Sequence, residues 1–100
     1  MNMRLTFTLL ILFCAFGASA QSYSLSGRVT DLQGKPVAFA SVYLKNTSKG
    51  TSANSEGEYQ LKLPAGKMEL IFKAIGYKQE TLPVDLTENR VLNAKLAPEV

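Results

Sequence analysis

From residue 22 onward the chain alternates apolar and polar positions in short runs, and turn residues separate the runs. A period of two is typical of a β-strand with one buried face. No segment after residue 21 offers about ten helix-favouring residues free of Gly and Pro, so we expect no helix in this part. The inward rows that we predict are Tyr23, Leu25, Gly27 and Val29; Ala40, Val42 and Leu44; Tyr59, Leu61 and Leu63; Met68, Leu70, Phe72 and Ala74; Leu82, Val84 and Leu86; and Leu92, Ala94 and Leu96.

Turn signals divide these rows at regular intervals. Residues 31–36, 55–57, 64–66 and 87–89 are rich in residue types that favour turns, and a polar loop leaves room for a short edge strand near 50–53. Six or seven strands about ten residues apart are typical of a sandwich. We therefore predict an all-β fold, a single antiparallel β-sandwich whose two sheets pack roughly 10 Å apart.

The first twenty residues have a different composition. Arg4 precedes an apolar run over 5–16, and small residues, including Ala18 and Ala20, end just before Gln21. This pattern predicts a secretory signal peptide over 1–20 and an exported mature domain over 21–100. The apolar run is shorter than the roughly 20 residues that span a bilayer, and an uncleaved N-terminal anchor is the alternative.

The residue types that carry most catalysis are missing. The chain has no histidine, and its single cysteine, Cys14, lies in the apolar run behind the bulky Phe13, which disfavours lipid attachment. A Ser/His/Asp triad is therefore impossible, and no local motif supports a Ser-Lys pair. The acidic residues fall on turns or strand ends without converging. We expect no enzyme activity, no catalytic residues and no cofactor.

The remaining charge and oxygen ligands exclude two further classes. The mature chain would hold ten Lys and Arg (eleven less Arg4) against eight Asp and Glu, a net charge of +2. These charges are scattered, so we expect no nucleic-acid partner. Residues 54–58 cluster oxygen atoms as a calcium loop does, but Gly57 separates Glu56 from Glu58, and a polar hairpin tip with no metal is expected.

Several large apolar side chains are out of phase with the inward rows. If Ala40, Val42 and Leu44 face the core, their aromatic neighbours face outward. Exposed apolar patches often mark contact surfaces. The alternative is that loops cover these side chains or that they lie on different sheets. The candidate interaction surface consists of Phe39, Tyr43, Ile71, Ile75 and Tyr77.

Three stretches together resemble a known family: SGRVTDLQGKPVAFASVYLKNTSKGTSANSEGEYQL, then LPAG, then IGY. They are similar to the carboxypeptidase-regulatory-like domain, a transthyretin-like (prealbumin-like) β-sandwich. The likeness is greatest to the version at the N-terminus of TonB-dependent receptors and related outer-membrane proteins of Gram-negative bacteria. It covers nearly all of residues 22–96. The hydrolase of this fold class depends on histidines that this chain lacks.

The resemblance implies a non-enzymatic accessory or interaction domain in the periplasm or at the outer membrane. Its partners would be an envelope protein or the downstream domains of a larger outer-membrane protein, and the mature domain itself would not span the membrane. The chain ends at 98–100, where the sandwich should end, so a piece of a larger product and a free-standing domain both stay open. Two further hypotheses remain: an enzyme of unknown type, and a carbohydrate-binding module that stacks a glycan on Tyr43, Phe39 and Tyr77, although the chain has no Trp.

Overall fold

The computed structural model describes residues 21–99, and the predicted signal peptide lies outside this range. Eight strands and no helix occur in the described residues. Accordingly, residues 21–99 include no helix long and apolar enough to cross a membrane. The strands are β1 (Ser22–Asp31), β2 (Ser41–Leu44), β3 (Gly50–Ser52), β4 (Glu58–Pro64), β5 (Gly66–Lys73), β6 (Glu80–Leu86), β7 (Arg90–Val91) and β8 (Ala94–Leu96).

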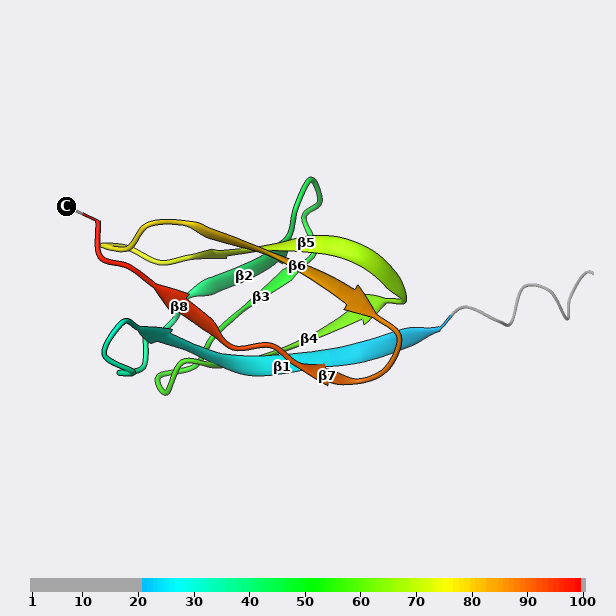
Figure 1. Cartoon of the computed structure of the whole chain (residues 1–100), viewed down its shortest axis with the longest axis horizontal. Helices are drawn as coiled ribbons and strands as arrows, with labels where there is room; N and C mark the ends of the chain where they lie inside the picture. The colour runs from blue at the N-terminus through cyan, green and yellow to red at the C-terminus, as the bar shows by residue number, and fades with distance from the viewer. Residues whose placement is uncertain (1–20, 100) are drawn as a thin grey trace, which may run out of the picture.

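The strands form two four-stranded sheets that face each other. One has the order β4-β1-β7, with β8 also paired to β1, and the other has the order β3-β2-β5-β6. Figure 1 shows them as a lower and an upper layer, with β1 starting at one end of the sandwich and the C-terminus leaving at the other. The all-β sandwich and the short edge strand near 50–53 are therefore confirmed.

The direction of the last strands corrects one part of the prediction. β7 and β8 both pair in parallel with β1, whereas we expected every pair to be antiparallel. After β6 the chain crosses to the other sheet and then runs in the same direction as β1 (Figure 1). A two-residue strand, β7, also precedes the last inward row, and Leu92 lies between β7 and β8. This gives eight strands where six or seven were expected.

Asparagine side chains complete the hydrogen bonding of β1 along this divided edge. The backbone N–H groups of Ser24 and Arg28 donate to the Oδ1 atoms of Asn89 and Asn93, each over 2.9 Å. Between them, the N–H of Leu92 donates to the carbonyl of Ser26 over 2.8 Å. Each backbone N–H of a strand is a strong donor, so the two side chains take the place of ladder partners where the parallel pairing is interrupted.

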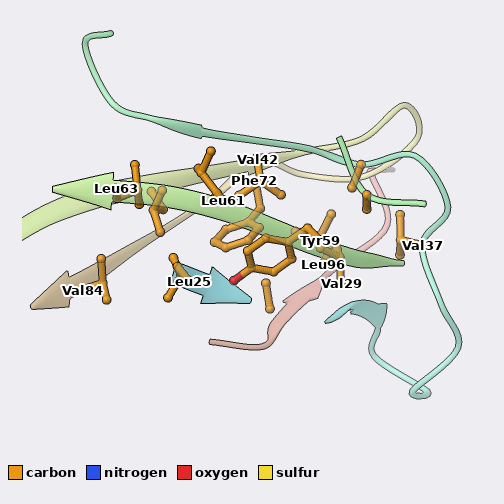
Figure 2. Packing of buried hydrophobic residues seen from close by; sticks show 14 of the residues in the cluster. Leu25, Val29, Val37, Val42, Tyr59, Leu61, Leu63, Phe72, Val84 and Leu96 are labelled. Carbon is orange, nitrogen blue, oxygen red and sulfur yellow. The ribbon is translucent and has the colours of Figure 1, made fainter. Parts of the chain in front are cut away.

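The core lies between the sheets and contains 13 of the 20 predicted inward residues, and six of the others pack against it partly buried. Phe72 of β5 and Tyr59 of β4 meet across it edge to face, with ring centroids 5.6 Å apart and an interplanar angle of 72° (Figure 2). Aromatic pairs prefer this arrangement. The buried cluster consists of Leu25, Val29, Val37, Ala40, Val42, Ala53, Tyr59, Leu61, Leu63, Leu70, Phe72, Val84, Leu86, Ala94 and Leu96.

Gly27 lets the interrupted edge approach the core. It lies opposite Tyr59 in the pairing of β1 with β4. A Cβ atom on Gly27 would stand 2.0 Å from the Leu92 carbonyl oxygen and 3.1 Å from Cε1 of Tyr59. That carbonyl accepts a hydrogen bond of 2.5 Å from the Tyr59 hydroxyl. The absent side chain of Gly27 therefore makes room for a bond that ties β4 to the kink between β7 and β8.

Two hairpin loops at one end of the sandwich have the same construction. The Oδ1 atom of Asp31 accepts the N–H groups of Gln33 and Lys35, and Oδ1 of Asn54 accepts those of Glu56 and Glu58, all over 2.9 Å. The residues at the fourth position, Gly34 and Gly57, have φ values of +87° and +77°. This is a type I turn followed by a glycine bulge. The side-chain oxygen of Asn54 thus serves its own loop.

Candidate functional site

The structure divides the five candidate surface residues into two groups. Phe39, Ile75 and Tyr77 line one groove, whereas Tyr43 and Ile71 lie opposite each other on paired strands β2 and β5. Ile71 is only 8% exposed, so its prediction as an accessible side chain is wrong. It is out of phase with the core row, as expected, but it lies on the interior strand β5 with Tyr43 of β2 and Thr81 of β6 paired on its two sides.

The groove lies at the end of the sandwich where the C-terminus leaves. It has a volume of about 320 Å³ and an apolar lining. β2 and β5 are paired as far as Ser41 and Lys73, and the same register carried two residues further would place Phe39 opposite Ile75. The groove is therefore the opening between the two segments that follow these paired strands, which are no longer hydrogen-bonded to each other. Its lining residues are Pro36, Val37, Ala38, Phe39, Ala74, Ile75 and Tyr77.

Phe39 has an unusual backbone conformation for an aromatic residue. Its φ is +61°, and its side chain is 70% exposed. The left-handed region costs a residue with a Cβ atom roughly 1–2 kcal/mol. Its N–H donates to the carbonyl of Asn54 over 3.2 Å, and Ala40 accepts from Ala53 over 2.8 Å, so flanking bonds hold this conformation. Strained residues of this kind cluster at functional sites, which makes Phe39 the first residue to test.

The other wall of the groove is a tight turn. The N–H of Tyr77 donates to the carbonyl of Ala74 over 3.1 Å, and Gly76 between them has a φ of +89°. Ile75 at the tip is fully exposed. The groove thus has one large exposed apolar side chain on each wall, Phe39 and Ile75. Tyr77, which lies deeper, packs partly against the core.

Outside this groove, two further hollows are more polar or lie at a sheet edge. One of about 550 Å³ is lined by Arg28, Glu58, Gln60 and Asn93 among others, on the outer face of β1 and β4. Another of about 510 Å³ lies between β5 and β6 and includes Arg90. Sequence reasoning did not single out either, because their residues are ordinary outward positions of strands. Neither gathers a recognisable set of reacting groups.

The described residues offer little reactive chemistry. Among residues 21–99, no group of three or more His, Cys, Asp or Glu side chains could hold a metal ion. No polar or charged residue in the same range is among the buried residues. Burial raises the pKa of the Tyr59 phenol above its usual range, because desolvation disfavours the phenolate. Tyr59 belongs to the core, and its hydroxyl donates a hydrogen bond to the Leu92 carbonyl. Its burial explains the raised pKa without a catalytic role.

The raised pKa of Tyr59 predicts a loss of stability in alkali. In the unfolded chain a tyrosine ionises near pH 10, so above that pH the folded state holds one proton more than the unfolded state. The free energy of unfolding should then fall as pH rises, by up to about 1.4 kcal/mol per pH unit from this group. Urea unfolding followed by circular dichroism measures the slope. Tyr59→Phe should be less stable near neutral pH but have a shallower slope above about pH 10; equal slopes would contradict the assignment.

The comparison with protein families now decides the relationship. The model for the CarboxypepD_reg-like domain matches residues 25–100. The chain belongs to this family. The assignment agrees with the resemblance in the sequence and with the observed two-sheet sandwich.

Two relatives are TonB-dependent receptors. The chain is 35% identical over 81 residues to the TonB-dependent receptor SusC of Bacteroides thetaiotaomicron, which covers 81% of this chain and 8% of the receptor. It is 29% identical over 99 residues to the TonB-dependent receptor P39 of Formosa agariphila, covering 96% of this chain and 9% of that protein. The chain therefore spans less than a tenth of the length of these receptors.

Solved structures share the fold at low identity. A DUF3823 family protein from Parabacteroides merdae superposes with a TM-score of 0.60 at 20% identity, covering 80% of this chain and 48% of that one. A catechol 1,2-dioxygenase from Acinetobacter sp. ADP1 superposes with a TM-score of 0.66 at 12% identity, covering 82% and 54%. At such identities the likeness concerns the sandwich alone, since one fold hosts many unrelated functions.

Proposed function

We propose that this domain is a non-enzymatic accessory module of a TonB-dependent receptor-like outer-membrane protein, placed at its N-terminal side behind a signal peptide over residues 1–20. The observation that carries the proposal is the match of nearly the whole chain to a small part of two TonB-dependent receptors. In this arrangement the mature domain lies on the periplasmic side of the outer membrane and acts by contact with its own downstream domains or with another envelope protein.

The site supports a contact role better than a chemical one. The groove at the C-terminal end of the sandwich has an apolar lining, and Phe39 and Ile75 expose large side chains there. Such exposed apolar groups are typical of contact surfaces. The glycan alternative is not favoured, because the three aromatic residues that would stack on a sugar do not share a platform: Tyr43 does not line the groove of Phe39 and Tyr77.

A deletion in the native receptor-length protein tests this proposal. Removing residues 22–97 while keeping the leader should leave a protein that still reaches the outer membrane, because domains of this kind fold as separate units. The growth rate on nutrients whose uptake depends on the receptor should fall severalfold, because the contact made by the accessory domain is lost. A strain that carries the deletion and grows like the parent on every such nutrient would overturn the accessory role. Equal amounts of receptor in the outer membrane, measured by immunoblot, are the control.

A further inference from the structure

The groove lies between residues 36–40, which precede β2, and residues 74–78, which follow β5. Beyond Ser41 and Lys73 the two segments diverge, and no backbone hydrogen bond between residues 36–40 and 74–78 is present in the described chain. The N–H groups of Val37 and Phe39 donate instead to the carbonyls of Val29 and Asn54, away from the groove. An extended peptide can therefore enter between the two walls without displacing an existing strand.

The C-terminal residues approach this groove from its rim. The N–H of Lys78 donates to the carbonyl of Ala97 over 2.8 Å, and the N–H of Glu99 donates to the carbonyl of Gly76 over 2.9 Å. Tyr77 and Pro98 form an antiparallel bridge between these two bonds. Because the pairing is antiparallel, each further residue of the chain moves from Lys78 toward Ile75. The described chain thus ends beside one wall of the groove (Figure 1).

We propose that the groove binds the polypeptide that follows this domain in the receptor-length protein, as an extended segment that places a large apolar side chain between Phe39 and Ile75. This inference rests on the proposed function, which supplies the continuation. Docking would fix the domain against the segment that leads to the rest of the receptor. It would also cover Phe39 and Ile75, two of the four large apolar side chains that are exposed in residues 21–99.

The size of the groove favours a tethered segment over a separate partner. Two apolar side chains support a dissociation constant on the order of 1 mM. A segment joined by a short linker has an effective concentration in the same millimolar range, so it can occupy such a site. A second copy of the domain would need an interface of about 1,200 Å² or more for a stable complex.

The charges around the groove also disfavour a bilayer as the occupant. Lys35, Lys73 and Lys78 adjoin the lining residues, but Asp31 and Glu99 lie on the same end of the sandwich. Binding to an anionic membrane surface depends on clustered positive charge. The mixed signs here suit a polypeptide segment better.

Thiol labelling of an Ala38→Cys variant tests the proposal in the intact protein, because Ala38 is exposed in the groove while Phe39 and Ile75 both stay in place. Residues 21–100 contain no cysteine, and the label at position 38 is quantified on its own proteolytic peptide by mass spectrometry. N-ethylmaleimide should react about twofold or more slowly in the receptor-length protein than in the chain of residues 21–100, which corresponds to a docked population of about half or more. Val91→Cys, at a position that is 67% exposed and outside the groove, should react equally in both lengths.

A second substitution links protection to the groove. Adding Phe39→Gly to the Ala38→Cys variant should restore fast labelling in the receptor-length protein, because one wall of the groove is removed while the left-handed backbone suits glycine. Equal labelling in the two lengths, or protection that survives Phe39→Gly, would overturn the proposal.

Two other occupants give their own results in the short chain. Protection that grows with the concentration of the short chain would indicate a second copy. Protection by vesicles of phosphatidylethanolamine and phosphatidylglycerol would indicate a bilayer. Either result would overturn the tethered segment. If a receptor-length product exists but labelling at position 38 is unprotected, only this inference fails. If no such product exists, the proposed function itself fails.

Discussion

Gly27→Ala is expected to destabilise the domain by about 3 kcal/mol or more. The new Cβ atom would stand 2.0 Å from the carbonyl oxygen and 2.7 Å from the carbonyl carbon of Leu92, both backbone atoms that no rotamer change can move. The kink between β7 and β8 would have to retreat, and the hydrogen bond from Tyr59 would be lost. Since a domain of this size has a total stability of only about 5–10 kcal/mol, this is a large fraction. Urea unfolding monitored by circular dichroism measures the change.

Gly34→Ala is the matched control. Gly34 has a φ of +87°, but a Cβ atom there would meet nothing within 4 Å. Its alanine variant should lose only the roughly 1–2 kcal/mol that the left-handed conformation costs. If Gly27→Ala is no more destabilising than Gly34→Ala, the close approach of Leu92 to β1 is wrong.

Phe72→Ala should lower the free energy of unfolding by about 3–5 kcal/mol, the range for removal of a buried aromatic side chain. Phe72 is fully buried and packs edge to face against Tyr59, so truncation removes both apolar burial and the aromatic pair. The cavity would open between the two sheets, where neither can close it without moving a whole strand. Equilibrium unfolding in urea, with the slope compared to that of the parent, gives the loss.

Phe39→Gly is the informative comparison for that substitution. Phe39 is 70% exposed and has a φ of +61°, so glycine loses little burial and relieves the backbone strain. Stability should stay unchanged or rise by about 1 kcal/mol. This pair of results would show that one phenylalanine stabilises the sandwich while the other is kept at a cost to stability. A loss of more than about 2 kcal/mol in Phe39→Gly would instead give Phe39 a structural role.

The alternation of the sequence was enough to predict the strands and their buried faces. Rows such as Tyr59, Leu61 and Leu63 are buried as a period of two requires. The turn positions also followed from local chemistry, since Asp31 and Asn54 cap their own loops ahead of a glycine. These features depend on neighbouring residues, so a single sequence contains the information for them.

The pairing of the last strands and the burial of Ile71 could not be predicted in the same way. The parallel pairing of β7 and β8 with β1 joins residues about 65 positions apart in the sequence. The side chains of Asn89 and Asn93 take part in it, and no local pattern distinguishes these two asparagines from ordinary turn residues. Ile71 was expected to be exposed because its phase is outward. Its burial depends on which strands flank β5, which is a property of the sheet order.

The candidate site was predicted in part. Sequence phase identified Phe39 and Ile75 as outward residues, and the structure brings them to opposite walls of one groove. The left-handed conformation of Phe39 could not be foreseen, because an aromatic residue gives no signal for it. The proximity of the C-terminal residues to the groove arises from the bridge between Tyr77 and Pro98, which is again a contact between distant segments.

The central claim is that this domain works as a small part of a long outer-membrane protein. The size and location of the natural product test it most directly. Cells are fractionated, and the outer-membrane, periplasmic and cytoplasmic fractions are blotted with antibodies raised against residues 21–99. We expect the signal in the outer-membrane fraction, in a polypeptide about ten times the length of this chain, as the relatives' coverage of 8% and 9% implies. A product of the size of the domain alone, free in the periplasm or cytoplasm, would contradict the account.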